Sequence, residues 1–168
     1  MTSLANRTYL NEYISAKFEE ARQKKKLFGI ELMDIDYFKE FNDTNGHLAG
    51  DACIEEVANV LRTVENENIF CGRYGGDEFM IVYTGMTVDE IREVTEKIQT
   101  GVRALKIPHI SSGCADIVTV SQGVFVRVPA EQNREWDYSV RADAILYQAK
   151  KSGKNCYKID TEFFDTDN

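Results

Sequence analysis

This sequence of 168 residues lacks most of the features that mark secreted, membrane-bound and nucleic-acid-binding proteins. Its four cysteines are widely spaced and form no C-x-x-C pair, which favours small core residues in a reducing cytosol over a disulfide framework. We expect no leader peptide and no membrane segment, because no apolar run approaches the roughly 20 residues of a membrane helix. Basic residues number 20 against 28 acidic ones, and the net charge of −8 argues against general binding to nucleic acid or to lipid surfaces. These absences predict a cytoplasmic location, either of the whole protein or as the cytoplasmic module of a longer, membrane-anchored chain.

The residues that are present describe one globular domain in which helices and strands alternate. Hydrophobic residues make up 43% of the chain and charged residues 29%, as in ordinary domains with a real core. Apolar positions recur at helical spacing in some segments, and short β-branched or aromatic runs mark the strands. The expected helices cover residues 4–26, 48–64, 87–105 and 133–151, and the expected strands cover 27–33, 69–71, 79–83, 117–128 and 155–159. This order predicts an α+β fold (an α/β sandwich) with a mixed sheet over residues 1–160, and an acidic tail, 161–168, that we expect to fray.

Residues 73–79 (RYGGDEF) separate two of the expected strands. The pair Gly75 and Gly76 predicts a tight hairpin turn. Asp77 and Glu78 follow at once, and adjacent strand residues point to opposite faces, so we expect the two acids to have different roles. Bare backbone beside two acids suits a polyphosphate and its metal ion. A solvated turn is the simpler explanation for such a tetrapeptide on its own.

A second acidic segment, residues 34–39 (DIDYFK), directly follows the first expected strand. Asp36 is explained as the N-cap of a short helix that starts at Tyr37. Asp34 has no such explanation, and a buried unpaired charge is costly. If the strands that carry Asp34 and Asp77 are neighbours, the two carboxylates converge. Together with a main-chain carbonyl and phosphate oxygens they would form a hard-oxygen site suited to Mg²⁺ or Mn²⁺.

Other polar residues would complete a site for phosphoryl transfer. Lys39 and Lys150 would add positive charge near the phosphates, and Glu78 would accept a proton from an attacking hydroxyl or bind a second metal. Taken alone, His47 is an ordinary loop histidine, and Asp51 complements a helix dipole.

Several motifs together resemble the GGDEF-domain diguanylate cyclase family. Residues 73–79 match its signature without a mismatch, and residues 34–39 look like its DIDxFK segment. The resemblance runs in order and spacing from about residue 2 to about residue 157. Its further motifs are residues 4–7 (LANR), 42–47 (NDTNGH), 50–51 (GD), 142–150 (ADAILYQAK) and 153–155 (GKN).

The resemblance implies a fold, an activity and a set of residue roles. The fold would be a palm-like, mixed or antiparallel sheet of about five strands flanked by helices, similar to the catalytic domains of nucleotide cyclases. The activity would be the condensation of two GTP molecules into cyclic di-GMP with release of two pyrophosphates, in a transient homodimer whose subunits each hold one GTP. A sensor or regulatory domain would be attached in the full-length chain.

The residue roles are carried over by position. Asp34, the carbonyl of Ile35 and Asp77 would hold Mg²⁺ or Mn²⁺, and Asp77 and Glu78 would be the catalytic acids. Asn42 and Asp51 would bind the guanine edge, where a mixed set of donors and acceptors suits guanine and rejects adenine. The residues that would contact the nucleotide are Lys39, Asn42, His47, Asp51, Gly75, Gly76, Lys150 and Lys154.

The sequence departs from the family pattern at several places, one of which is Ser3, where the N-terminal motif usually has glycine. Asn66 and Ile69 occupy the ends of the RxxD product-inhibition motif, so we predict that this inhibitory site is absent. Gln122 stands where the family usually has an apolar residue, and Lys154 replaces the usual arginine, which turns a planar two-point phosphate contact into a point charge.

Three functions remain open from the sequence. The first is an active diguanylate cyclase, the second is a GTP-binding regulatory module with little or no turnover, and the third is another nucleotide cyclase or transferase on the same palm.

Overall fold

The computed structural model describes residues 4–162, so residues 1–3, and residues 163–168 of the expected tail, lie outside the described part. The helices are α1 (Arg7–Lys24), α2 (Phe38–Asn45), α3 (His47–Val64), α4 (Val88–Ala104) and α5 (Glu135–Lys151). The strands are β1 (Phe28–Ile35), β2 (Ile69–Gly75), β3 (Glu78–Thr84), β4 (Val120–Arg127) and β5 (Tyr157–Asp160).

The five strands form one open sheet in the order β2-β3-β1-β4-β5. Strand β1 is antiparallel to both of its neighbours, β3 and β4, whereas β4 and β5 are parallel. The predicted mixed sheet and α+β class are therefore confirmed. Strand β1 is buried along almost its whole length, because it is central and helices cover both faces of the sheet.

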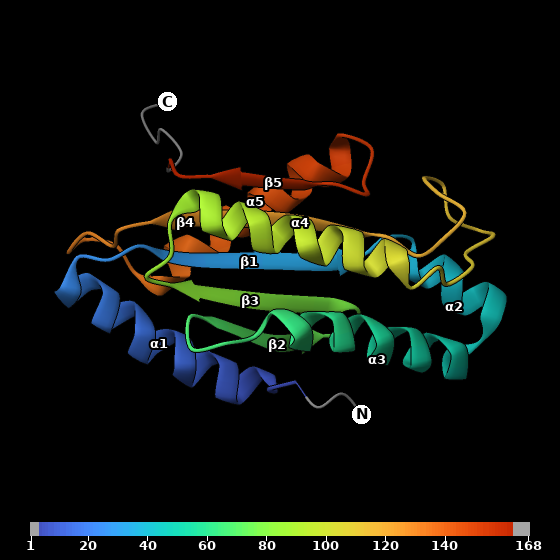
Figure 1. Cartoon of the computed structure of the whole chain (residues 1–168), viewed down its shortest axis with the longest axis horizontal. Coiled ribbons are helices and arrows are strands. Elements are labelled where there is room, and N and C mark those ends of the chain that lie inside the picture. Colours follow the sequence, from blue (N-terminus) through green and yellow to red (C-terminus); the bar gives the residue numbers. More distant parts are fainter. Residues whose placement is uncertain (1–3, 163–168) are drawn as a thin grey trace.

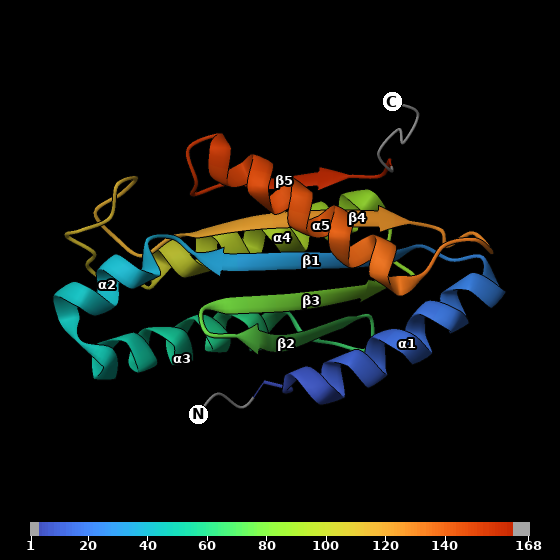
Figure 2. The same cartoon turned by 180° about the vertical axis from the view of Figure 1, so that it is seen from behind.

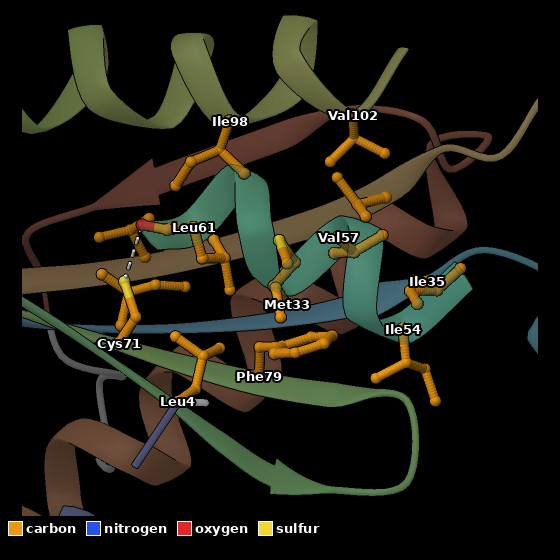
Figure 3. Close-up of a cluster of buried hydrophobic side chains, with 14 of the residues drawn as sticks. Leu4, Met33, Ile35, Ile54, Val57, Leu61, Cys71, Phe79, Ile98 and Val102 are labelled. Atoms are coloured by element: carbon orange, nitrogen blue, oxygen red, sulfur yellow. Dashed lines mark hydrogen bonds between the residues drawn. The ribbon is translucent and has the colours of Figure 1, made fainter. Parts of the chain in front are cut away.

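The helices form a layer on each face of the sheet. Helices α3 and α4 cover the face seen in Figure 1, and α1 and α5 cover the face seen in Figure 2, while α2 lies beyond one end of the sheet. The larger core cluster lies between the sheet and the α3–α4 layer, where Val57 and Leu61 of α3 meet Met33 and Phe79 of the sheet (Figure 3). In the part of the chain that the structure describes, no helix is both long and apolar enough to cross a membrane.

Close packing between α5 and β4 depends on Gly123. A Cβ atom at this position would lie 2.2 Å from the backbone nitrogen of Leu146 and 2.6 Å from its Cα, distances that no side chain tolerates. Gly123 thus lets the backbone of α5 approach the centre of the sheet. This contact fixes α5, and with it Lys150, relative to the end of β1.

The structure corrects the expected path after β1. Residues 42–47 were expected to form a loop, but α2 extends through Asn45 and only Gly46, with φ +88°, separates it from α3. The polar residues of this segment are therefore held on two consecutive helices. The remaining expected elements exist, with ends displaced by a few residues.

Candidate active site

The acidic residues of the two motifs meet at one end of the sheet. Asp34, near the end of β1, lies directly opposite Glu78, the first residue of β3. The backbone nitrogen of Ile35 donates a hydrogen bond to the carbonyl oxygen of Asp77 at 3.4 Å. The condition under which Asp34 and Asp77 converge, that their strands are neighbours, is therefore met.

The turn that carries the signature differs by one residue from the expectation. Gly75 still belongs to β2 and pairs with Glu78, so the two turn residues are Gly76 and Asp77 rather than the two glycines. Gly76 has φ +51°, a left-handed conformation that favours glycine. Arg73 secures the turn by donating from Nε at 3.0 Å and from Nη2 at 2.7 Å to the Gly76 carbonyl.

A hollow of about 420 Å³ opens on one side of this turn, and we call it the α2–α3 hollow. It brings together most of the residues that the resemblance assigns to the nucleotide, together with Arg73. Its polar lining consists of Lys39, Asn42, His47, Asp51, Arg73, Gly76 and Asp77.

A second hollow of about 340 Å³, the α5 hollow, lies on the other side of the hairpin. Asp34, Glu78 and Lys150 line it, together with Trp136 and Asp143. Asp77 and Glu78 thus line different hollows, although Asp77 lies in the turn and only Glu78 on the strand. Asp34 shares its hollow with Glu78 and not with Asp77.

Asn42, which lines the α2–α3 hollow, carries an unused acceptor. Its Oδ1 atom is buried and has no hydrogen-bond partner among residues 4–162. Gly50 of α3 makes room for this side chain, since a Cβ atom at Gly50 would lie 1.8 Å from Asn42 Oδ1. A buried acceptor without a donor is costly, and residues 4–162 supply no donor to this atom.

Two carboxyl groups at the sheet end, those of Asp77 and Glu78, have a raised pKa. Burial is the main cause of the raised pKa of Asp77, and the charge of Asp34 adds to it. The pKa of Glu78 is also raised, first by burial and then by the charges of Asp34 and Asp77. Acids whose charged forms are destabilised by burial and by neighbouring negative charge are a fitting environment for a cation.

Lys150 of α5 supplies one cation to this end of the sheet. Its Nζ atom forms an ion pair with Oδ2 of Asp34. Burial lowers the pKa of Lys150, but the hydrogen bond and charge of Asp34, with Asp77 and Glu78, raise it above its ordinary value. Asp34 is therefore bound by a lysine, and a metal ion at its carboxylate would share or displace this contact.

Asp36 does not cap α2, so the capping interpretation is wrong. Its carboxylate accepts from Thr119 Oγ1 at 2.7 Å, from Ser121 Oγ at 2.6 Å and from the backbone nitrogen of Asn155 at 2.9 Å. The N-cap of α2 is Tyr37, which has φ 53° and makes no side-chain capping bond. Buried Asp36 instead ties the end of β1 to β4 and to the turn before β5.

The first turn of α2 is open to an anion. Because no side chain caps this eight-residue helix, its first backbone N–H groups have no capping acceptor. The Nζ atom of Lys154 lies 3.8 Å from the centre of the Tyr37 ring, beside the start of α2. Exposed Lys39 lies in the first turn of the helix and lines the α2–α3 hollow.

The donor set at the sheet end fits a hard divalent cation that also binds substrate oxygens. Two carboxylates, from Asp34 and Asp77, and the neighbouring main chain at Ile35 offer only oxygen ligands, as Mg²⁺ and Mn²⁺ prefer. Within residues 4–162 no group of three or more His, Cys, Asp or Glu side chains is arranged to hold a metal ion. This agrees with a site that Mg²⁺ would complete with phosphate oxygens and water rather than with a cage of side chains.

Sequence reasoning missed three contributions to this site. Arg73 lies inside the signature, yet only the fold shows that it holds the turn. Asp36 acts through residues of β4 and the last turn, which are more than 80 positions away. Trp136, 70% exposed, borders the α5 hollow, and no motif pointed to it.

The open mixed sheet, with two acids beside its hairpin and a polar hollow lined by two helices, defines an α+β domain with a candidate ligand site at one end of the sheet. The chain belongs to the GGDEF domain family: the family profile described as "Diguanylate cyclase, GGDEF domain" matches residues 1–156.

Curated relatives and solved structures agree with this assignment. The chain is 31% identical over 156 residues to "Probable diguanylate cyclase DgcC" of Escherichia coli K12. The matched region covers 92% of this chain and 41% of that protein. It is 35% identical over 137 residues to "Diguanylate cyclase A" of Treponema denticola, covering 79% of this chain and 35% of that protein.

Among solved structures, the GGDEF domain of DgcB from Caulobacter crescentus in complex with c-di-GMP superposes with a TM-score of 0.84 at 30% identity, covering 94% of this chain and 89% of that one. The active GGEEF domain of a diguanylate cyclase from Vibrio cholerae gives a TM-score of 0.80 at 29% identity, covering 95% of this chain and 99% of that one. The chain spans about two fifths of the length of the curated relatives it matches, so it corresponds to one domain of those proteins.

Proposed function

We propose that this domain is a diguanylate cyclase that condenses two GTP molecules into cyclic di-GMP with release of two pyrophosphates. The observation that carries the proposal is the buried, unpartnered Oδ1 atom of Asn42, in a hollow that also holds Asp51 and ends at Asp77. A hydrogen-bond acceptor and a carboxylate at one end, and an acidic metal site at the other, suit a guanine nucleotide with its triphosphate.

Guanine fits the α2–α3 hollow better than adenine does. Guanine has two donor groups, N1–H and the exocyclic amine, on the edge that would face Asn42 and Asp51. Adenine presents an acceptor in place of N1–H, so it would leave a carboxylate or the buried Asn42 oxygen unpaired. We infer that base selection depends on these two side chains, with His47 near the nucleotide.

The triphosphate would extend from the hollow toward the acidic sheet end. Asp34, Asp77 and the Ile35 carbonyl would hold Mg²⁺ or Mn²⁺, which when bound neutralises the phosphates and polarises the α-phosphorus. Lys39, Lys150 and Lys154 would contact the phosphates as point charges. Gly75 and Gly76 leave the backbone of the turn accessible, since a Cβ atom at either would meet nothing within 4 Å.

Glu78 is our candidate for the group that takes the proton from the attacking 3′-hydroxyl or binds a second metal ion. Burial and the neighbouring acids raise its pKa, which makes its carboxylate a stronger base than an ordinary glutamate. The hydroxyl and the α-phosphate that react would belong to different GTP molecules. Two copies of the domain must therefore face one another in a transient homodimer.

The wider context of the domain is proposed by analogy. Related structures include a domain joined to a coiled coil and a diguanylate cyclase bound to its activator. We propose that an attached sensor or regulatory domain brings two copies of this domain together, and that the domain works in the cytoplasm. Because Asn66 and Ile69 replace the RxxD ends, and Ile69 is buried, we propose that product inhibition at that site is absent.

The direct test is incubation of the purified, concentrated domain with GTP and Mg²⁺, followed by chromatographic detection of cyclic di-GMP and pyrophosphate. The wild-type chain should form both, and Asp77→Ala should lower the rate by at least about 10³-fold, the scale of loss when one group that stabilises a transition state is removed. Its melting temperature should remain close to that of the wild type. An Asp77→Ala variant with unchanged turnover would refute the metal assignment.

The second candidate is a GTP-binding regulatory module with little turnover. It is favoured by the ion pair that Lys150 forms with Asp34, because this contact occupies a proposed metal ligand. Tight GTP binding without product, in a dimer-competent sample where a control cyclase is active, would establish this second function. Product from ATP instead of GTP would point to another cyclase on the same fold.

A further inference from the structure

Asn155, in the turn between α5 and β5, is held by several hydrogen bonds at once. Its backbone nitrogen donates to Asp36 Oδ2 at 2.9 Å, and its carbonyl oxygen accepts from Arg103 Nη2 at 3.2 Å. Its Oδ1 atom accepts from Arg103 Nε at 2.9 Å and from Gln99 Nε2 at 3.1 Å. Lys154 and Asn155 have left-handed backbones, with φ 63° and 49°, a conformation that is unfavourable for lysine and that asparagine adopts more readily. Helix α4, which carries Gln99 and Arg103, therefore restrains a strained turn that includes Lys154 (Figure 1).

Gln122 of β4 fixes the orientation of the Gln99 amide. Its Nε2 atom donates to Gln99 Oε1 at 2.9 Å and to the Thr95 carbonyl at 3.1 Å. Gln99 Nε2 donates to the Val120 carbonyl at 3.0 Å as well as to Asn155. If the Gln99 amide turned over, two donors would face each other at Gln122 and two acceptors would face each other at Asn155. Gln122 therefore donates to Gln99 and Gln99 donates to Asn155, and only one orientation of the Gln99 amide satisfies both hydrogen bonds.

Packing alone does not explain a glutamine at position 122. This side chain is fully buried, and its Oε1 atom has no hydrogen-bond partner in the described range 4–162. A buried unpaired acceptor disfavours folding, and the family pattern usually has an apolar residue here. Both donor hydrogens of Gln122, in contrast, are used. Gln122 thus makes the folded state less stable than an apolar residue would, and the effect that the structure shows is the fixed orientation of the Gln99 amide.

Asn155 connects the two sides of the region proposed for the phosphates. On one side its backbone binds Asp36, which directly precedes Tyr37 and the uncapped N-terminus of α2. On the other side it directly follows Lys154, whose ammonium group lies over the Tyr37 ring. A shift of Asn155 would therefore move Lys154 relative to the start of α2.

We propose that Gln122 is a positioning residue for the nucleotide: through Gln99 and Asn155 it holds Lys154 and the N-terminus of α2 at the spacing that the outer phosphates require. Gln122 touches no substrate in this proposal and lies on the sheet face that α4 covers. The inference rests on the proposed function, because it takes the ligand to be a guanosine triphosphate.

The test compares the binding of GTP and GMP, each with Mg²⁺, to the wild type and to Gln122→Leu by titration calorimetry. Leucine has nearly the same size but no amide. The affinity for GTP should fall about tenfold, the equivalent of one charge-assisted contact. The affinity for GMP, which lacks the outer phosphates, should stay within about twofold, a free-energy difference of only a few tenths of a kcal/mol. A general structural defect would instead lower the affinity for both nucleotides. The ratio of the two affinities therefore separates a loss of positioning from a loss of folded structure.

Two further sets of variants test the route of the effect. Gln99→Leu should give the same selective loss, and the double variant Gln99→Leu/Gln122→Leu should lose no more than the worse single one, because the residues act in series. Lys154→Ala should weaken GTP binding in the wild type but add little in the Gln122→Leu background. Thr95→Val is the matched control: it changes a buried side chain on the same helix whose hydroxyl hydrogen-bonds to the Ile91 carbonyl at 2.8 Å and to Tyr83, so the GTP-to-GMP ratio should not change.

The possible outcomes separate this inference from the proposed function. A folded Gln122→Leu variant with unchanged GTP binding, or with equal losses for both nucleotides, overturns the positioning role alone. So does a Lys154→Ala effect that stays full in the Gln122→Leu background. If neither Gln122→Leu nor Gln99→Leu folds, the network is structural and the inference fails. A wild-type chain that binds no GTP overturns the proposed function, and this inference with it.

Discussion

At Gly50, one added methyl group should change nucleotide binding and stability in opposite directions. The Cβ atom of Gly50→Ala would force Asn42 Oδ1 away from its position, since the two would lie 1.8 Å apart. Alanine is also favoured over glycine inside a helix by about 1 kcal/mol. We expect GTP affinity to fall about tenfold while the free energy of unfolding stays equal or rises.

Calorimetric titration with GTP and urea denaturation measure these two quantities for Gly50→Ala. Binding of Mg²⁺ tripolyphosphate serves as the control, because it does not involve Asn42 and should not change. Unchanged GTP affinity would mean that Asn42 does not read the base.

Glu31, in the middle of β1, predicts a dependence of stability on pH. Its side chain is fully buried and accepts one hydrogen bond, from the Tyr83 hydroxyl at 3.0 Å. Burial raises the pKa of Glu31 from its ordinary 4.5 to about 8, against the lowering effect of the Tyr83 bond. Between these values the folded chain keeps a proton that the unfolded chain releases. The free energy of unfolding should therefore fall as the pH rises, by up to ~1.4 kcal/mol per pH unit from this group.

Urea denaturation at several pH values between about 5 and 9, the span that brackets both pKa values, checks this prediction. Glu31→Gln keeps an acceptor for Tyr83 but cannot titrate, so its stability should depend less on pH and should exceed that of the wild type at the alkaline end. Parallel pH profiles for the two proteins would show that Glu31 does not titrate in this range.

Among the elements, the contact of α5 with β4 should be the most sensitive to a small increase in side-chain size. Gly123→Ala places a Cβ atom 2.2 Å from the backbone of Leu146, and a backbone cannot move aside as a flexible side chain can. We expect a loss of about 1–3 kcal/mol or more in the free energy of unfolding, as for overpacked cores. Cyclase activity should fall as well, because α5 carries Lys150.

Gly29→Ala on the neighbouring strand β1 is the control for this substitution. Its Cβ would lie 3.4 Å from the Cβ atoms of Tyr83 and Val126, close to ordinary contact distances. The free energies of unfolding from the denaturation curves of Gly123→Ala and Gly29→Ala should therefore differ clearly from each other. Equal losses would mean that glycine itself, and not the approach of α5, matters on these strands.

The elements and the residues were not equally predictable from the sequence. Periodicity located four of the helices and all five strands because each buries one apolar side. A short helix was expected to start at Tyr37, but its continuation through residues 42–45 was missed, because short polar residues favour a loop locally while Phe38 and Phe41 are buried in the fold. The turn position was also missed, since the bulge between Arg73 and Gly75 moves the two turn residues to Gly76 and Asp77.

The candidate site was predictable only where its residues belong to short sequence motifs. The motifs placed Asp34, Asp77 and Glu78 in one site, and the pairing of β1 with β3 brings them to one end of the sheet. The role of Asp36 depends on partners in β4 and before β5, so no local pattern contained it. Gln122 stood out in the sequence as a departure, but its partners on α4 became visible only in three dimensions.

For the whole molecule, the proposed reaction predicts a strong dependence on concentration. Because each copy would hold one GTP and two copies must meet, a weakly associating domain should form product at a rate proportional to the square of its concentration. Tenfold dilution should then lower the rate about a hundredfold instead of tenfold, by mass action. Initial rates over a dilution series, with molar mass followed by light scattering, measure this. A rate proportional to concentration in a monomeric sample would exclude the dimeric mechanism.

The hairpin between the two hollows also bears on how such a domain can diverge. The side chains proposed to recognise the base line one hollow, whereas Asp34, Glu78 and Lys150 line the other. Asp77 belongs to the first hollow yet lies beside β1, so it is the residue at which the two hollows meet. Substitutions at Asn42 or Asp51 can therefore alter which nucleotide is accepted without disturbing the acids on the opposite side. Selection can change specificity and chemistry in separate steps, and Asp77 is the position where a change would affect both at once.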